Sequence, residues 1–277
     1  MVAATSPTRL AGKPPRRACS STSSALEARL WANWHPDGVD ERLDTALELF
    51  RLAERQHMQE LAVVARRWRV VALLESGRLA EARSEIAEHA RAARTLRLPY
   101  ELMYASVFST MRALLEGRLD DARLESARVA AFGELRGGAD ALQFVGVHHL
   151  TFGMLRNELA GIVDAIRAYA DGYPAVPAWR TGLGYALIEA GRLDEARAEV
   201  DRLWPPESKL PKDASWLVAI SVLGIIVTRL GDRTRAEHLC RLLEPYGDRP
   251  VLLGAGGAVW GVGALYLGLL AGAAQPA

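Results

Sequence analysis

The sequence predicts an all-α protein built from helical hairpins that repeat with a period of about 40. Three observations favour this fold class. Ala and Leu, which both favour helix, account for 46 and 40 of the 277 residues. Apolar residues recur three and four positions apart along most of the chain, as on one face of an amphipathic helix. A short turn motif containing Gly returns at a regular spacing.

The turns of the predicted hairpins are marked by Gly-Arg-Leu, which begins at Gly77, Gly117 and Gly191, and by Gly-Asp-Arg at Gly231. Asn157 fills the remaining position, so the spacings between successive turns are 40, 40, 34 and 40. A helix often ends on a residue with positive φ, which Gly adopts without steric cost and Asn tolerates better than most residues. Each motif is therefore predicted to end one helix and to precede another.

The second helix of each hairpin starts with residues that suit close packing. A small side chain stands five residues after the turn residue in four of the five repeats, where it would let the two helices approach each other. Ile162 breaks this pattern in the Asn157 repeat. Acidic residues follow most turns, as expected for the first turn of a helix. The small residues are Ala82, Ala122, Ala196 and Ala236.

These patterns assign the middle of the chain to helices. No composition shift divides residues 25–271, so we expect one helical repeat domain there, followed by a disordered tail at 272–277. The longest loop between repeats, 204–213, contains three prolines. The expected elements are helices at about 25–34 and 40–56, hairpins at about 60–95, 99–135, 139–173, 177–204 and 214–246, and a single helix at about 256–271.

The two ends of the chain differ from its middle. Residues 1–24 hold four basic residues, no acidic residue and no long apolar run, which predicts a disordered basic leader; a transit peptide is the alternative. Residues 251–277 carry no charge and are long enough to cross a membrane. Seven glycines between Gly254 and Gly272, with no basic cluster after them, instead favour a helix buried against the last hairpin.

The hairpin motif resembles the tetratricopeptide repeat. This resemblance implies a right-handed α-solenoid whose first helices line a concave face. Val70 and Thr110 stand where the motif has a close-packing Gly, and a period of 40 exceeds the standard 34 by more than one helical turn. The main positions of the motif are filled by Leu183, Gly184, Gly191, Ala196 and Val200 in one repeat and by Leu223, Gly224, Gly231, Ala236 and Cys240 in the next.

Four segments are also similar to the C-terminal repeat region of large bacterial ATP-binding regulators, the AAA-type LuxR-type and adenylate or guanylate cyclase-like proteins. The similarity covers about 25–271 and implies a role in regulation or signalling. Gly12 and Lys13 are followed by Pro14, so they form no phosphate-binding loop, and no cyclase domain or DNA-reading helix-turn-helix is evident. The four segments are 65–74, 173–179, 210–216 and 266–270.

Alignment of the first helices on their turn residues predicts a binding groove on the concave face. It places there an aromatic stripe with one basic group, which suits an extended or helical peptide whose carboxylate pairs with Arg67. The alternative is that many of these rings simply pack between helices. The predicted groove residues are Arg67, Trp68, Tyr104, Phe108, Phe144, His148 and Tyr185.

Other candidate sites are weaker. His148 and His149 are adjacent, so on a helix their side chains point about 100° apart and do not chelate one ion well; no metal site is expected. The basic run at 66–69 could contact phosphate, although such runs more often form a solvated helix face. Cys240 fills a large apolar slot and is expected in the core. The 34 basic and 33 acidic residues exclude nucleic-acid binding through bulk charge.

The sequence therefore predicts a bacterial, cytoplasmic interaction module, either a scaffold or a regulator, that binds a protein, peptide or small ligand. We expect no enzymatic activity and no cofactor, because no nucleophile–base pair, metal-ligand set or cofactor loop is evident. We also expect no direct binding to nucleic acid and no membrane insertion, with the uncharged C-terminal segment as the open question. The alternative function is a truncated repeat fragment of a multidomain ATPase or cyclase-type regulator. The pattern does not specify the oligomeric state.

Overall fold

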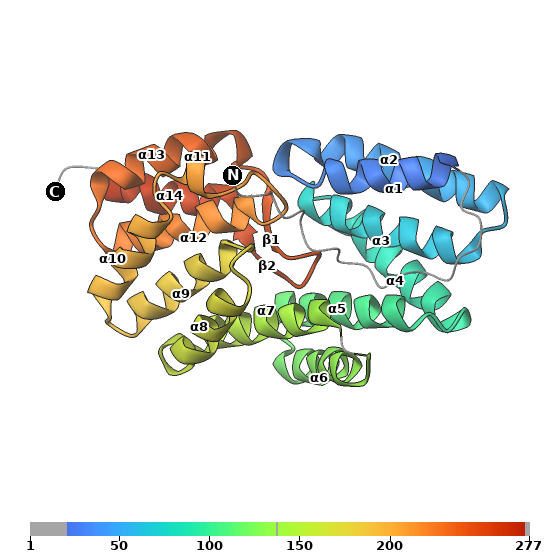
Figure 1. Ribbon diagram of the computed structural model, residues 1–277, viewed down its shortest axis with the longest axis horizontal. Helices are drawn as coiled ribbons and strands as arrows, with labels where there is room; N and C mark the ends of the chain where they lie inside the picture. The colour runs from blue at the N-terminus through green and yellow to red at the C-terminus, as the bar shows by residue number, and fades with distance from the viewer. Residues whose placement is uncertain (1–20, 137, 275–277) are drawn as a thin grey trace, which may run out of the picture.

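The computed structural model describes residues 21–136 and 138–274, which are mostly helical (Figure 1). Most of the predicted leader lies outside these residues. Its last part, 21–24, is helical, because α1 (Ser21–Ala32) begins earlier than expected. The single turn η1 (Pro36–Gly38) then leads into α2 (Val39–Arg55). Of the predicted tail, residues 272–274 belong to the last helix.

Long helices joined by short links make up the next part of the chain. Each described turn between α2 and η2 has one residue in the left-handed region, and these residues are spaced by 20 or by 40. Gly77, Gly117 and Asn157 confirm the predicted turns, with φ of 74°, 72° and 59°. His57 and Arg97 occupy the same position with φ of 55° and 51°. The helices are α2, α3 (Gln59–Glu75), α4 (Leu79–Thr95), α5 (Pro99–Leu115), α6 (Leu119–Arg136) and α7 (Ala139–Arg156).

The following helices are shorter, but the turns at Gly191 and Gly231 again have positive φ, as predicted. The Ala residues five positions after Gly77, Gly117, Gly191 and Gly231 are all buried, which confirms the close approach of paired helices. The proline-rich loop contains one short helix. The elements of this part are η2 (Leu159–Ile162), α8 (Val163–Gly172), α9 (Ala178–Glu189), α10 (Leu193–Arg202), α11 (Pro206–Lys209), α12 (Trp216–Arg229), α13 (Arg233–Leu243) and η3 (Glu244–Tyr246).

The end of the chain departs from the prediction. Instead of one helix from about 256, it forms an antiparallel β-hairpin of β1 (Pro250–Leu253) and β2 (Ala258–Val262), followed by α14 (Gly263–Ala274). In the register, Leu253 pairs with Ala258 and Leu252 with Val259, and an irregularity separates these pairs from Pro250 and Val262. Gly254 and Gly256, with φ of 58° and 91°, allow the chain to reverse.

The helices surround this hairpin in a closed arc, with both strands in its middle (Figure 1). β1 contacts α3 and α12, while β2 contacts α5, α7 and α14. The hairpin contributes side chains to two apolar clusters, one with Val251, Leu253 and Trp260 among the C-terminal helices and one with Leu252 and Ala255 among α3, α5 and α7. α14 packs against α12 and α13. None of the helices described in residues 21–136 and 138–274 has the length and apolar character needed to span a membrane.

Candidate functional site

The concave face, where the sequence predicts a binding groove, holds the β-hairpin. A Cβ added to Gly256 would lie 2.7 Å from the ring of Phe108, so only Gly lets the hairpin backbone lie so close to that ring. One added to Gly257 would lie 3.2 Å from the ring of Phe144. The indole of Trp260 is buried and donates a hydrogen bond of 3.0 Å to Oγ1 of Thr151 on α7. The hairpin thus packs on these helices as part of the core.

The predicted groove residues are therefore not an open surface. Tyr104, Phe108 and Phe144 do come together, with ring centroids 5.9 Å and 5.4 Å apart, but the hairpin and neighbouring helices bury them. Trp68 lies apart from this group and packs at right angles to Trp31. The prediction that they line an open groove is therefore wrong for five residues, which are all buried: Trp68, Tyr104, Phe108, Phe144 and His148.

Tyr185 is the last of the seven predicted groove residues. It is half-buried. Its ring lies 6.3 Å from that of Trp260, in an edge-on arrangement. Burial raises the pKa of its hydroxyl, and nearby Glu189 adds to this effect. Tyr185 therefore also packs against the hairpin, on α9.

Arg67 pairs with a carboxylate of this chain, whereas the sequence predicts a pair with the carboxylate of a bound peptide. Its Nε lies 3.1 Å from Oε2 of Glu101, and the same oxygen lies 2.9 Å from Nε2 of His89. The guanidinium also lies over the ring of Tyr104, 4.5 Å from its centroid. Tyr100 adds a hydrogen bond of 2.7 Å to Asp140. We call these residues the Arg67 cluster; they join α3, α4, α5 and α7.

Arg67 and Glu101 stay charged in the Arg67 cluster although both side chains are largely buried. Burial opposes the carboxylate of Glu101, yet the charge of Arg67 and the hydrogen bond from His89 hold its pKa below the usual value. For Arg67 burial likewise opposes the charge, and Glu101 with the two tyrosines raises the pKa above the ordinary one. The half-buried Glu27 on α1 has a pKa raised by burial. The guanidinium of Arg67 is thus paired within the chain, while Nδ1 of His89 is buried without a hydrogen-bond partner among the described residues.

His148 is fully buried on α7, and its Nδ1 lies 2.9 Å from the hydroxyl of Ser126. Burial lowers the pKa of the ring to about 3, so His148 is neutral at physiological pH. His149, the next residue, is exposed. The described residues contain no group of three His, Cys, Asp or Glu side chains that could hold a metal ion.

The basic run at 66–69 is also paired within the chain. Arg66 and Arg69 reach Glu85 on α4 at 2.9 Å and 3.3 Å. This arrangement differs from the solvated face that the sequence suggests, because α4 packs beside α3. Cys240 is partly buried rather than fully in the core, and it packs at the edge of the apolar core formed by the C-terminal helices. Cys19 lies outside the described residues.

A polar contact that the sequence does not predict joins η1 to η3 and to the loop between α11 and α12, and so connects the two ends of the arc. Asp37 on η1 accepts a hydrogen bond of 2.5 Å from Tyr246 and lies 2.6 Å from Nζ of Lys212. The Lys212 ammonium also lies 5.4 Å from the ring centroid of Trp216. We call Asp37, Lys212 and Tyr246 the latch. No local pattern could reveal it, since 209 residues separate Asp37 from Tyr246.

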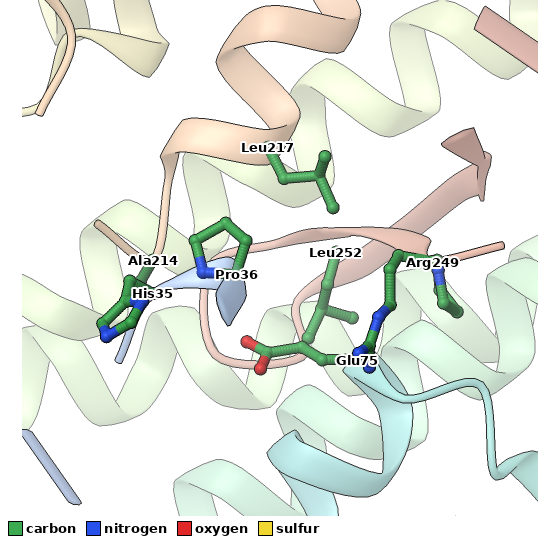
Figure 2. A pocket seen from close by; sticks show the side chains of 8 residues that line it. His35, Pro36, Glu75, Ala214, Leu217, Arg249 and Leu252 are labelled. Atoms are coloured by element: carbon green, nitrogen blue, oxygen red, sulfur yellow. The ribbon is translucent and has the colours of Figure 1, made fainter. Parts of the chain in front are cut away.

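Beside the latch is a cavity of about 20 Å³ (Figure 2). Figure 2 shows that segments far apart in sequence surround it: Pro36 at the start of η1 with His35 just before it, Glu75 at the end of α3, and Arg249 and Leu252 from the hairpin region. Such a volume has room for about one water molecule, so the cavity is too small for a ligand.

A larger groove lies on the outer side of α5, between α4 and α6, with a volume of about 470 Å³. We call it the outer groove. Buried Met103 lies in its floor, and half-buried Phe132 and exposed Leu135 line it from α6. The exposed Arg94 and Arg128 are also among the lining residues. Sequence reasoning missed this groove, because it searched the first helices alone for a concave surface.

Comparison with known proteins adds no relative. No protein-family model, no curated protein and no solved structure matches the chain.

Proposed function

We propose that the chain is a non-enzymatic helical-repeat module of the tetratricopeptide type that docks a protein partner on its outer surface. The observation that carries this proposal is the burial of the β-hairpin on the concave face. Val251 and Ala258 are fully buried, and Trp260 is 4% exposed. A partner that used the concave face would first have to remove this hairpin.

Removal of the hairpin would be costly. Burying a large apolar side chain contributes roughly 1.5–3 kcal/mol, and four such side chains on the hairpin are buried. Their combined contribution is comparable to the whole stability of a typical domain, about 5–15 kcal/mol. The hairpin is therefore part of the core and not a weakly bound segment that a ligand would displace. The four side chains are Val251, Leu252, Leu253 and Trp260.

The charges of the concave side support the same proposal. Arg67 is neutralised by Glu101, and His148 is neutral and buried against Ser126. Neither is placed to act on a substrate. Membership of the ATP-binding regulator family, and with it the alternative function as a repeat fragment of a larger regulator, stays a prediction from the similar segments.

The experiment is to lock the hairpin in place and to ask whether the protein still captures partners. A Cβ added to Gly257 would lie 3.1 Å from Cγ1 of Val147, close enough for a disulfide between Val147→Cys and Gly257→Cys. Cys19 and Cys240 are replaced by Ser in the same protein. Oxidised and reduced samples of this one variant are used as bait in a lysate of the cells that produce the protein, and the bound proteins are quantified by mass spectrometry.

Equal capture by the oxidised and reduced samples is expected, since the outer surface is the same in both. Capture by the reduced sample alone would show that a partner displaces the hairpin and would overturn the outer-surface proposal. No enrichment by either sample over blank resin would overturn the interaction function. The variant with only Val147→Cys controls for the substitution itself.

A further inference from the structure

The outer groove is on the side of α5 that faces away from the hairpin. Phe108 contacts the hairpin at Gly256, while Ser106, two residues earlier, lines the groove. Residues two positions apart on a helix are separated by about 200°, so they point to opposite sides. The groove is therefore accessible while the hairpin stays in place, as the proposed docking on the outer surface requires.

The lining of the groove is apolar and partly uncovered. Leu135 on α6 is 83% exposed, the highest value among the exposed large apolar side chains of the described chain. Phe132, one turn earlier on the same helix, is half-buried, and Met103 lies in the floor at 3% exposure. Phe132 and Leu135 thus give the groove an apolar wall above the buried Met103, which an apolar side chain of an occupant could cover.

The charge at the edge of the groove is positive. Arg94 on α4 lines it and makes no ion pair with another residue in the part of the chain that the structure describes. The sequence from 91 to 97 contains three arginines and no acidic residue. On the α6 side, the exposed Arg128 lies 2.6 Å from Glu125, which also lines the groove. The three charged lining residues, Arg94, Arg128 and Glu125, therefore carry a net charge of +1, which an occupant with acidic side chains would complement.

We propose that the outer groove binds an acidic amphipathic helix of a protein partner. The walls of the groove are two helices, and Arg94 and Arg128 lie on different walls. A helix with apolar residues three and four positions apart presents one apolar strip to Met103, Phe132 and Leu135, with acidic residues on both flanks to face the arginines. This inference deepens the proposed function, and it rests on that function for the existence of a partner.

The probe is a synthetic 15-residue peptide, acetylated and amidated, with Leu at positions 1, 4, 8 and 11, Glu at the flanking positions and Ala elsewhere. Its binding to the full chain is measured by fluorescence anisotropy, with a charge-reversed peptide (Lys for Glu) as the matched comparison. The variants are Arg94→Glu with Arg128→Glu, and separately Leu135→Glu. Leu193→Glu, on α10 and exposed to 45%, is the control for an added charge at an exposed Leu. Circular dichroism checks that each variant keeps its helices.

The acidic peptide is expected to bind at least 10-fold more tightly than the basic one. The double arginine variant and Leu135→Glu should each weaken binding at least 5-fold, while Leu193→Glu leaves it unchanged. Equal binding of the two peptides would overturn the acidic occupant, and no binding of the acidic peptide up to 1 mM would overturn the site. Repeating the capture experiment with the double arginine variant separates the two proposals. Undiminished capture would leave the interaction function standing and remove the groove from it.

Discussion

Trp260 on the hairpin and Thr151 on α7 share a buried hydrogen bond of 3.0 Å, although 109 residues separate them in sequence. Water cannot reach the indole N–H, so the hydroxyl oxygen of Thr151 is the acceptor that satisfies this donor. This bond fixes the depth at which the second strand lies on the concave face. Loss of it should therefore weaken the attachment of the hairpin.

Thr151→Val keeps the shape of the side chain but removes the acceptor. We expect the free energy of unfolding, measured by urea denaturation, to fall by about 1–3 kcal/mol, the usual cost of a buried unsatisfied donor. Thr234→Val is the matched control, because Thr234 is exposed on α13. Equal stabilities of Thr151→Val and the wild type would contradict the role of this bond.

Glu101→Gln should destabilise the protein, because it leaves the buried guanidinium of Arg67 without a countercharge. The expected loss is about 3–5 kcal/mol. The pKa of Glu101 is lowered in the folded state, so its contribution is fully present above its ordinary pKa of 4.5 and is lost as pH falls below it. The difference between wild type and Glu101→Gln should therefore shrink in acid. Glu237→Gln, which removes an exposed pair with Arg233, should have little effect at any pH.

His148→Gln should change how stability depends on pH. Folding lowers the pKa of His148 from 6.5 to about 3, so the unfolded chain binds the extra proton first. The neutral ring stabilises the fold above about pH 6.5, and this contribution is lost as pH falls from 6.5 toward 3. Over that range the wild type should lose up to about 1.4 kcal/mol per pH unit more than the variant. A parallel pH dependence in urea denaturation would contradict the prediction. His149→Gln, at the exposed neighbouring position, should run parallel to the wild type.

Asp37→Asn should loosen the latch without unfolding the protein. Hydrogen bonds from Lys212 and Tyr246 lower the pKa of Asp37, and both partners lose its charge in the variant. Because the side chain of Asp37 is half exposed, the effect on global stability should be small. Amide hydrogen exchange in α1, η1 and α2 should become faster. Asp40→Asn, an exposed neighbour on α2, should leave exchange unchanged.

Two turn residues with positive φ allow substitutions that should change stability in opposite directions. Gly191 has φ of 71°, and a Cβ added there would meet nothing within 4 Å, so Gly191→Ala should cost about 1 kcal/mol through the backbone alone. Arg97 holds the equivalent conformation with φ of 51°. Arg97→Gly should therefore raise the free energy of unfolding, by up to about 1 kcal/mol. Thermal denaturation of the two variants, which should shift in opposite directions, checks both.

The sequence predicts most of the helical hairpins because their signals are local. Gly77, Gly117, Asn157, Gly191 and Gly231 each end a helix through their own backbone preference, and the structure confirms all five. The intervening turns at His57 and Arg97 fall in the predicted gaps between helices at 57–59 and 96–98, but no Gly or Asn there predicts their positive φ. The residues with positive φ are therefore spaced by 20 in this part of the structure, whereas the turn motif recurs every 40 in the sequence.

The β-hairpin could not be separated from a helix by the same reasoning. Residues 250–262 are apolar throughout and buried on several sides, so neither a period of two nor one of 3.6 stands out. A signal did exist: two short apolar runs flank the Gly-rich stretch from Gly254 to Gly257, which is typical of a hairpin. The prediction of an open groove failed because of this one segment, since Phe108 and Phe144 do lie on the inner side.

The central position of the hairpin also has a consequence for synthesis. In an ordinary repeat array each unit contacts only its neighbours, so it can complete its packing as soon as the next unit leaves the ribosome. Here the inner faces of α5 and α7 receive their cover from residues 250–262. Phe108 is therefore covered only by a segment that is made after eight more α-helices, α6 to α13, have emerged. Until then the apolar inner faces of α5 and α7 stay uncovered on the growing chain.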